Sequence, residues 1–474
     1  MYLENTHAGA DGIGAALAKR KKLRFIGVGG VQMSSLALAA AARGFAVSGS
    51  DSVESAGTAR VRRAGIPVFI GEDAVAAAAA DAGVFTLAIS PENAEYRALL
   101  AAGNPLFSRA DFLAYLTSPY PRRIGVAGSH GKSTVTAMLT EIFAAARRSP
   151  TAFCGAEMPR FGGGYLAGEG EDVVFEACEY RDSFLCLSPT LAIVLNIALD
   201  HTDYFPDLAA VRSSFAAYVR ACVARGGAAL CRAEDAALFA DAGEEVHTFG
   251  RGGEYTATEI SFREGFASFS PARGGESFGR VTLKAAGEHQ IGNALAAAAA
   301  ADISGVPRAV IVSALSDFRG IDRRFTERGA LCGARVFEDY AHHPAEIAAV
   351  LGTARAMTKG RLFAVFQPHT YSRTAAFLSE IAAALCAADR VWIAPIFAAR
   401  ERDTGEVSAA RLAAAIGKKA AALSLKTIAA ELSDTVRAGD TVVVMGAGDV
   451  GRLFGEFSAK DFTSCPKSGT IREE

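Results

Sequence analysis

The chain has 474 residues, a length that predicts about two to four domains. Half of the residues are hydrophobic and 21% are charged, which favours globular domains over disorder. The formal net charge of −2 gives no electrostatic basis for binding nucleic acid or an anionic membrane surface, so we expect neither partner. An anionic ligand would have to be held by local loops and single Arg or Lys residues.

The eight cysteines are scattered and include no C-x-x-C pair. This pattern argues against a zinc ribbon or a disulfide framework and indicates a reducing compartment. No apolar run follows the charges near the N-terminus, and no stretch of about 20 residues is free of polar interruption. We therefore expect no signal peptide, no membrane span and a cytoplasmic location, and no obligate protein partner is evident.

The first unit of the chain extends to about residue 115. Residues 1–22 read as a loose tail with a basic end, and residues 23–33 as a strand, a glycine turn and a helix. A second strand at 45–51 ends in Asp51, which is typical of a dinucleotide-binding fold, although Gln32 stands at the last glycine of G-x-G-x-x-G. The turn could hold NAD or FAD, hold a UDP group, or simply let the strand pack on the helix.

A phosphate-binding loop is expected at residues 128–133, after a polar, proline-rich linker at 117–122. It lies between a buried strand and a helix, so its backbone N–H groups would point at one spot at the positive end of that helix. Lys132 would supply a charge for the phosphates and Ser133 a hydroxyl for Mg²⁺. Val126 replaces the first glycine of the full Walker A spacing, which leaves Gly-x-x-Gly-Lys-Ser. The pattern predicts ATP or GTP binding.

Two more strands of this second unit end in polar side chains. Glu176 closes the strand at 172–176, and Asp200 and His201 follow the apolar strand at 191–197. Ligands gather at the carboxyl ends of parallel strands, so these groups could form an oxygen-rich Mg²⁺ site beside a nucleotide. His201 could equally be a loop histidine that caps a helix. The glycine-rich residues 228–281 suggest a small antiparallel insertion.

The composition changes at residue 321, where a third parallel-sheet unit is expected. Its strands begin near residues 336, 362, 391 and 441, and each is followed by polar residues or glycines. The adjacent His342 and His343 would point apart in an extended chain and have no further ligand nearby, which argues against zinc.

In this order, the motifs resemble the Mur ligases over residues 23–455. The resemblance is carried by residues 25–34, 48–51, 128–134, 176–180, 196–204, His289 with Asn293, 323–325, 339–347, 366–374 and 445–449. It implies an α/β protein of three domains: a Rossmann-like UDP-sugar-binding domain at 1–117, a central P-loop ATPase with a parallel sheet at 118–320, and a C-terminal Rossmann-like domain for the amino acid at 321–474.

The stretches Tyr-Ala-His-His-Pro and Gln-Pro-His-x-Tyr-x-Arg-Thr are similar to those of the members that join L-alanine to the lactyl carboxylate of UDP-N-acetylmuramate in peptidoglycan precursor synthesis. The resemblance implies ATP and Mg²⁺ as cofactors, an acyl phosphate formed on that carboxylate, and attack by the amine of alanine. Such chemistry needs positioning and charge cancellation rather than a covalent nucleophile. Cys178 is therefore expected to serve packing.

The resemblance also implies roles for individual residues. As catalytic residues it implies Lys132, His201, Arg324 and His342. As ATP contacts it implies Gly128, Ser129, His130, Gly131, Lys132, Ser133, Thr134, His289, Asn293, Arg324 and Asp339. As UDP-sugar contacts it implies Gly27, Gly29, Gly30, Met33, Ser34, Ser50 and Asp51. As amino-acid contacts it implies Tyr340, His342 and Arg373, and as Mg²⁺ ligands Ser133, Glu176 and His201.

Three features depart from the family pattern. Gln32 replaces a usual glycine, and Thr370 stands where a second arginine is frequent. No lysine lies between Lys132 and Lys284, so the carbamylated lysine of several relatives has no counterpart in that stretch.

Four other functions would use some of the same motifs. The nearest is a ligase that adds a recycled tripeptide to the same UDP-sugar, although no insertion enlarges the amino-acid site. A non-catalytic UDP-sugar or ATP sensor disagrees with the intact Lys132, Ser133, Glu176 and His201. Residues 23–115 argue against folylpolyglutamate synthase, which lacks the first domain, and the phosphate loop argues against an NAD-dependent oxidoreductase.

Overall fold

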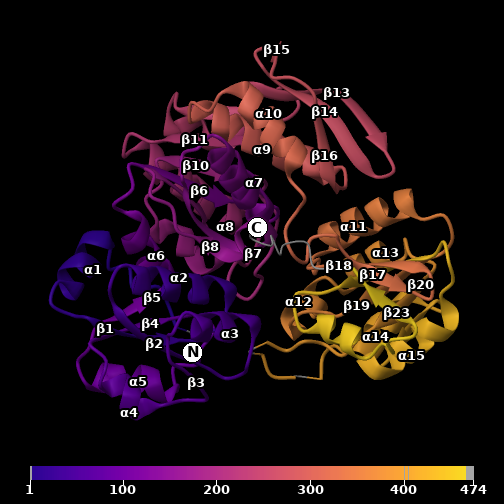
Figure 1. Cartoon of the computed structure of the whole chain (residues 1–474), viewed down its shortest axis with the longest axis horizontal. Coiled ribbons are helices and arrows are strands. Elements are labelled where there is room, and N and C mark those ends of the chain that lie inside the picture. Colours follow the sequence, from indigo (N-terminus) through magenta and orange to yellow (C-terminus); the bar gives the residue numbers. More distant parts are fainter. Residues whose placement is uncertain (1–2, 400, 404, 466–474) are drawn as a thin grey trace, which may run out of the picture.

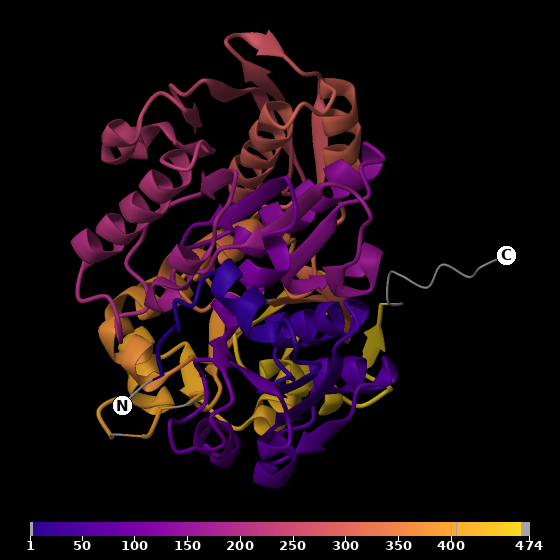
Figure 2. The ribbon, with the colours of Figure 1, turned by 90° about the vertical axis from the view of Figure 1, so that its left-hand side faces the viewer.

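The computed structural model describes residues 3–399, 401–403 and 405–465. Figures 1 and 2 show three α/β lobes, each built on its own sheet, grouped around a common centre. The α/β class and the three-domain organisation predicted from the sequence are confirmed. Within the described ranges, no helix has the length and apolar character needed to cross a bilayer.

The N-terminal lobe is a five-stranded parallel sheet with the order β3-β2-β1-β4-β5. Its strands are β1 (Lys22–Ile26), β2 (Ala46–Asp51), β3 (Val68–Ile70), β4 (Ala82–Phe85) and β5 (Leu106–Ser108), and its helices are α1 (Ala10–Leu17), α2 (Val31–Ala42), α3 (Ala56–Arg63), α4 (Ala74–Ala78), α5 (Ala94–Ala101) and α6 (Arg109–Thr117). The strand order reverses between β1 and β4, next to the glycine turn that follows β1. Ligands bind at such a switch point in open α/β sheets.

The prediction of a loose tail before β1 is wrong. Residues 10–17 form α1, whose Ile13 and Leu17 are buried one helical turn apart. The preceding segment is held by Asp111 of α6, which accepts hydrogen bonds from the backbone N–H and the hydroxyl of Thr6 at 2.8 and 2.7 Å. The tertiary contacts with α6 therefore order a segment whose local sequence looks polar.

The central lobe has an 11-stranded mixed sheet, so the expectation of a parallel sheet needs correction. Strands β12-β11-β10-β6-β9-β7 run parallel, whereas β8 at one edge and β14, β15 and β16 at the other pair antiparallel. The strands are β6 (Arg122–Ala127), β7 (Thr151–Met158), β8 (Gly163–Leu166), β9 (Asp172–Glu176), β10 (Leu191–Val194), β11 (Ala228–Arg232), β12 (Val246–Phe249), β13 (Tyr255–Arg263), β14 (Phe266–Arg273), β15 (Glu276–Ser277) and β16 (Val281–Ala286).

The antiparallel insertion expected at 228–281 is smaller than predicted, because β11 and β12 continue the parallel sheet. The true hairpin is β13–β14, whose turn at Glu264 and Gly265 has positive φ at both residues, as a type I′ turn requires. The helices of this lobe are α7 (Lys132–Ala145), α8 (Leu208–Val223), α9 (His289–Ile303) and α10 (Arg308–Asp317), with short 3-10 turns η1 (Pro159–Phe161), η2 (Tyr180–Cys186) and η3 (Ala233–Ala242).

The C-terminal lobe has a seven-stranded sheet with the order β21-β20-β19-β22-β18-β17-β23. The first five strands are parallel, and β17 and β23 add an antiparallel edge. Its elements are β17 (Thr326–Leu331), β18 (Ala334–Asp339), α11 (Pro344–Met357), β19 (Leu362–Phe366), α12 (Tyr371–Ala376), α13 (Leu378–Leu385), β20 (Arg390–Ile393), α14 (Ala409–Ile416), β21 (Ala420–Ala422), α15 (Leu425–Thr435), β22 (Thr441–Met445), η4 (Val450–Gly455) and β23 (Phe462–Ser464). The central strands β19 and β22 are buried along their whole length, as their continuous apolar runs predict.

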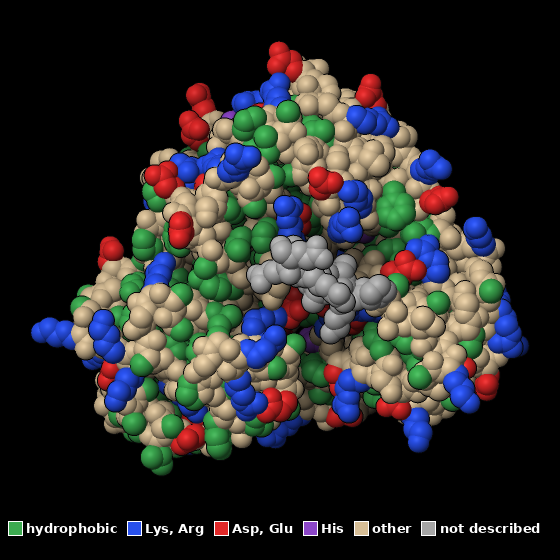
Figure 3. All heavy atoms as spheres, viewed as in Figure 1, with side chains coloured by type: hydrophobic (Ala, Val, Ile, Leu, Met, Phe, Trp, Pro, Cys, Tyr) green, Lys and Arg blue, Asp and Glu red, His purple; other side chains and the backbone are tan. Residues whose placement is uncertain are grey.

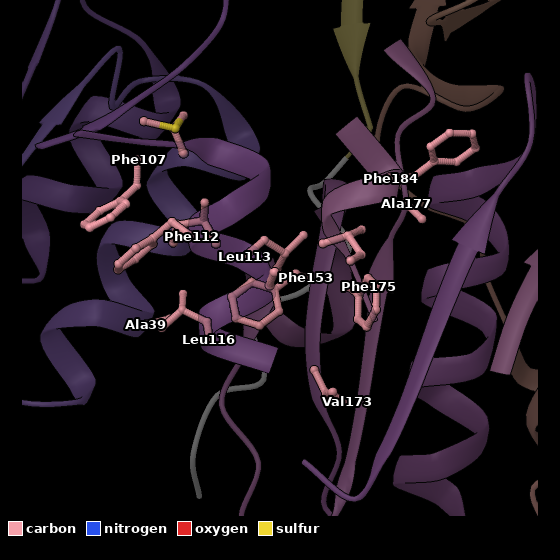
Figure 4. Packing of buried hydrophobic residues seen from close by; sticks show 14 of the residues in the cluster. Ala39, Phe107, Phe112, Leu113, Leu116, Phe153, Val173, Phe175, Ala177 and Phe184 are labelled. Atoms are coloured by element: carbon pink, nitrogen blue, oxygen red, sulfur yellow. The ribbon is translucent and has the colours of Figure 1, made fainter. Parts of the chain in front are cut away.

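The N-terminal and central lobes share one hydrophobic core. A single cluster contains Phe112 and Leu113 of α6 together with Phe153 of β7 and Phe175 of β9, and Figure 4 shows these side chains on both sides of the boundary. The clusters of the C-terminal lobe contain described residues of that lobe alone. The first two lobes are therefore joined by apolar packing, whereas the third meets the central lobe through the polar contacts described below.

Candidate active site

The phosphate loop follows β6 and leads into α7, where the sequence places it. Gly128 and Gly131 have φ of 139° and 86°, a region that favours glycine. A Cβ on Gly131 would lie 2.6 Å from Oδ1 of Asn293, so the loop passes directly against α9. Asn196 fixes the loop from the other side: it accepts from the N–H of His130 at 2.9 Å and donates to its carbonyl at 3.0 Å. The loop is thus held in shape on two sides by amide side chains.

Lys132 begins α7 and has an acidic partner that the sequence did not identify. Its Nζ donates to both carboxyl oxygens of Glu179, at 2.9 and 3.1 Å, and to the carbonyls of Gly128 and Ser129. Burial disfavours the charge of Lys132, but Glu179, Cys178 and Glu176 together outweigh it, so the pKa of the lysine is raised. Lys132 therefore stays cationic and its ammonium group is held at the loop.

Ser133 and Glu176, two of the expected Mg²⁺ ligands, lie near each other. The thiol of Cys154 is 3.5 Å from both the carbonyl of Ser133 and Oε1 of Glu176. That oxygen also accepts from the N–H of Gly155, and a Cβ on Gly155 would lie 2.7 Å from Oε2. The backbone of β7 thus approaches the carboxylate closely and fixes its direction.

His201, the third expected ligand, contacts Glu179. Its Nε2 lies 3.6 Å from Oε1 of Glu179, and its ring packs on Tyr180 with 4.7 Å between centroids. In the described parts of the chain, no cluster of three or more His, Cys, Asp or Glu side chains could hold a metal by itself. A hydroxyl and one carboxylate do fit Mg²⁺, which keeps several waters and takes oxygens from substrate phosphates.

The glycine turn after β1 is closely packed by α3. Gly27 has φ of 81°, and the N–H of Gly29 donates to Oδ2 of Asp51 at 2.8 Å. A Cβ on Gly57 of α3 would lie only 2.1 Å from the carbonyl oxygen of Gly29. The turn, α3 and the acid at the end of β2 therefore form one unit at the switch point of the sheet.

Three predicted UDP-sugar residues have their side chains inside the lobe. Met33 and Ser34 are buried in α2, and the hydroxyl of Ser50 donates to the buried Glu95 at 2.6 Å. Gln32, which replaces a glycine of the family pattern, accepts a hydrogen bond from Arg109. These three side chains are therefore used within the lobe, and so are the N–H groups of Gly27 and Val28, which both donate to the carbonyl of Ser50 at 2.9 Å.

In the C-terminal lobe, Arg373 reaches across to the central lobe. It donates to Oδ1 of Asp200 from Nη2 at 2.8 Å and from Nε at 3.1 Å, and both side chains are about nine-tenths buried. Burial acts to raise the pKa of Asp200, but His201 and Arg373 hold it well below its usual range. The residue expected to bind an amino-acid carboxylate therefore holds a carboxylate of the protein. Thr370, which stands where a second arginine is frequent in the family, caps α12 and accepts a hydrogen bond from the N–H of Arg373 at 3.4 Å.

His342 and Tyr340 lie together beside this pair. Nδ1 of His342 is 3.0 Å from the carbonyl of Tyr340, and the two rings are edge to face at 5.5 Å. Burial lowers the pKa of His342 to about 4, so its ring is neutral near pH 7. The three predicted amino-acid contacts are thus close to the strand ends of the central sheet.

Asp339 and Arg324 were expected to reach ATP. The two oxygens of Asp339 accept from the N–H groups of Phe325 and Ala341, both at 2.7 Å, so this carboxyl also shapes its own loop. Burial raises the pKa of Asp339 to about 6. The guanidinium of Arg324 lies 5.3 Å from the centroid of Tyr340 and 3.6 Å from Glu346. His289, another expected ATP contact, begins α9, and burial, with the charge of Arg324, lowers its pKa to about 4.

Sequence reasoning did not predict the contacts of three acids, Glu179, Asp200 and Glu346: it considered Asp200 only for the possible Mg²⁺ site, whereas the structure pairs it with Arg373, and it assigned no role to the other two. All three lie in the recognised stretches, within three or four residues of an assigned side chain. Buried cations need acidic partners, so an acid close in sequence to an assigned residue was the available signal for each of these contacts. Figure 3 shows charged side chains of both signs near the boundary between the lobes, on the part of this face that is not grey.

Comparison with known proteins places this arrangement in one class. Three protein-family models match the chain: "Mur ligase family, catalytic domain" at residues 22–121, "Mur ligase middle domain" at 126–301, and "Mur ligase, glutamate ligase domain" at 323–448. The chain belongs to the Mur ligase family.

Curated relatives point to one member of the family. The UDP-N-acetylmuramate–L-alanine ligase of Acetivibrio thermocellus is 38% identical over 94% of this chain and 96% of its own length, and that of Lachnospira eligens is 39% identical over 90% and 96%. The crystal structure of the UDP-N-acetylmuramate–alanine ligase of Thermotoga maritima has a TM-score of 0.79 at 29% identity and covers 92% of this chain and 98% of that one. A murein peptide ligase from Psychrobacter arcticus shares the fold, with a TM-score of 0.72 at 24% identity over 92% and 98% of the two chains.

Proposed function

We propose that this protein is an ATP-dependent UDP-N-acetylmuramate–L-alanine ligase of peptidoglycan precursor synthesis. The relatives named above support the reaction over nearly the full chain. The observation that carries the proposal is the contact between Arg373 and Asp200. It brings the residue expected to hold alanine's carboxylate next to His201, at the strand ends where the phosphate loop also lies.

The residues support a division of labour. The N–H groups of the phosphate loop and Lys132 would bind the phosphates of ATP, and Arg324 would approach them from the C-terminal lobe. The lactyl carboxylate attacks the γ-phosphorus, ADP leaves and an acyl phosphate forms. The amine of alanine then attacks the acyl carbon and phosphate departs, so the atoms balance without a protein nucleophile. Arg373 would hold alanine's carboxylate meanwhile.

Mg²⁺ belongs to the proposal as a cofactor. Ser133 and Glu176 would hold it, with His201 nearby, and the ion would offset the negative charge of the phosphates. The residues of the chain then perform the remaining tasks. Glu179 keeps Lys132 in place. His342 lines the site for the amine, and because its ring is neutral it does not draw alanine's carboxylate away from Arg373.

A cytoplasmic location is also part of the proposal. All eight cysteines are unpaired, and the buried Cys154 and Cys222 have raised pKa values because burial disfavours the thiolate. Unreactive, unpaired thiols suit a reducing compartment.

The test is phosphate release in the presence of ATP, Mg²⁺ and UDP-N-acetylmuramate, with L-alanine, L-serine, glycine or the tripeptide as acceptor. We expect the highest kcat/KM with L-alanine. Release with the tripeptide alone would identify the recycling ligase instead. Binding of the UDP-sugar and ATP without any release would identify a sensor.

A further inference from the structure

Glu346 uses its two carboxyl oxygens in different ways. It lies in the first turn of α11, where Oε2 accepts from the N–H groups of His342 at 3.2 Å and His343 at 3.4 Å as part of a capping box. Oε1 lies 3.1 Å from Nδ1 of His130 and 3.6 Å from Nη1 of Arg324. The side chain is 11% exposed, so bulk water competes little for these contacts.

His130 is on the other side of the boundary between lobes. It lies in the middle of the phosphate loop, where Asn196 holds its backbone. Its side chain is held by the C-terminal lobe, through Glu346 and through the ring of His343 at 4.8 Å between centroids. His130 therefore has these two partners only while the C-terminal lobe is docked.

The charge of Glu346 exceeds what its helix requires. Burial acts to raise its pKa, but the hydrogen bond with His130 and the charge of Arg324 hold it well below the usual range, so the carboxylate is charged. A capping box needs one acceptor oxygen, which a glutamine supplies as well as a glutamate. The second oxygen and the charge are directed instead at two residues expected to contact ATP.

We propose that Glu346 is a positioning residue that couples docking of the C-terminal lobe to the shape of the phosphate loop and to the direction of Arg324. The inference rests on the proposed ligase function. ATP would be held in its reacting geometry only when the lobe that carries the amino-acid contacts is in place. Glu346 acts through His130 and Arg324: a swing of the C-terminal lobe away from the loop removes the contact with His130, whereas Arg324 moves together with Glu346.

The variant Glu346→Gln separates this role from helix capping, because the amide keeps the capping oxygen and the volume but loses the charge. We expect ATP affinity, measured by calorimetry with Mg²⁺, to fall about 10-fold and kcat to fall about 10- to 100-fold, the effect of weakening charge-assisted hydrogen bonds. KM for UDP-N-acetylmuramate and the melting temperature should stay at the wild-type values. The matched control is Asp207→Asn, the same change of acid to amide at the exposed cap of α8, which should leave all four quantities unchanged.

A double-mutant comparison tests the route of the effect. If Glu346 acts through His130, adding Glu346→Gln to a His130→Gln background should cost much less than adding it to the wild type. Fully additive effects, unchanged ATP affinity and kcat, or unfolding of the Gln variant despite its intact cap would each overturn the inference. A wild type that binds ATP yet releases no phosphate with any acceptor would instead refute the ligase function, and ATP binding would still test Glu346.

Discussion

Replacing Arg373 with lysine should weaken the binding of L-alanine specifically. In the structure Arg373 makes two hydrogen bonds to one carboxylate, at 2.8 and 3.1 Å, and its side chain is only 11% exposed. A lysine keeps the charge but not the planar fork, so it would lose at least one charge-assisted hydrogen bond to the substrate's carboxylate. Such a bond is worth about 1.5–3 kcal/mol, which predicts a rise in KM for L-alanine of roughly 10- to 150-fold.

The assay is phosphate release as a function of L-alanine at saturating ATP and UDP-N-acetylmuramate. KM for those two substrates should remain near the wild-type value. Arg390→Lys is the control, because Arg390 forms a half-exposed pair with Glu431 in the same lobe, and we expect a change within about twofold. A lower kcat with unchanged KM for L-alanine would refute the reasoning, since it would mean that Arg373 holds Asp200 during turnover and not the substrate.

Lys132→Ala should abolish phosphate release while UDP-sugar affinity stays at the wild-type value, because the lysine lies in the central lobe; a calorimetric loss of UDP-sugar binding would contradict this. Gly57→Ala should destabilise the fold by about 1–3 kcal/mol in urea denaturation and raise KM for the UDP-sugar, since its Cβ would clash with Gly29. Gly12→Ala in α1, with no atom within 4 Å of the new Cβ, should instead raise the free energy of unfolding by about 0.5–1 kcal/mol. If the two glycine variants changed the stability equally, a clash at Gly57 would be excluded. The pKa of His342 is lowered from 6.5 to about 4 in the folded protein. As the pH falls, the unfolded chain therefore takes up a proton on this histidine before the folded protein does. The free energy of unfolding should fall as the pH drops from 6.5 to 4, by up to about 3 kcal/mol. His342→Gln should reduce that slope, and an unchanged slope would refute it.

The sequence predicted those parts of the fold that depend on local pattern. Apolar runs such as 191–194 and 441–445 became fully buried strands of parallel ladders, because only strands covered on both faces are continuously apolar. Glycines placed at strand exits, such as Gly27 and Gly128, have the positive φ that those turns require. Chain order and turn chemistry were therefore enough for the class and the three-domain organisation.

The errors have a shared physical origin in contacts between distant segments. The helix α1 was missed because the segment before it is anchored by hydrogen bonds that Asp111, a residue of the distant helix α6, accepts. The antiparallel strand β8 was missed, and the antiparallel insertion was predicted to begin too early, because a strand's direction depends on its neighbours and not on its own residues. The pairing of Glu179 with Lys132 and of Asp200 with Arg373 was not predicted, because a buried cation shows its partner only once the chain is folded.

The two joints between the lobes differ in their chemistry, and salt should act on them in opposite directions. Sulfate strengthens the burial of apolar surface, so it would tighten the joint around Phe112 and Phe153. The same ions would screen the charges that draw Glu346 and Arg373 toward the central lobe whenever the third lobe has swung out and those charges face water. Raising the ionic strength should therefore weaken the joint of the third lobe, while the shared apolar cluster keeps the first two lobes together.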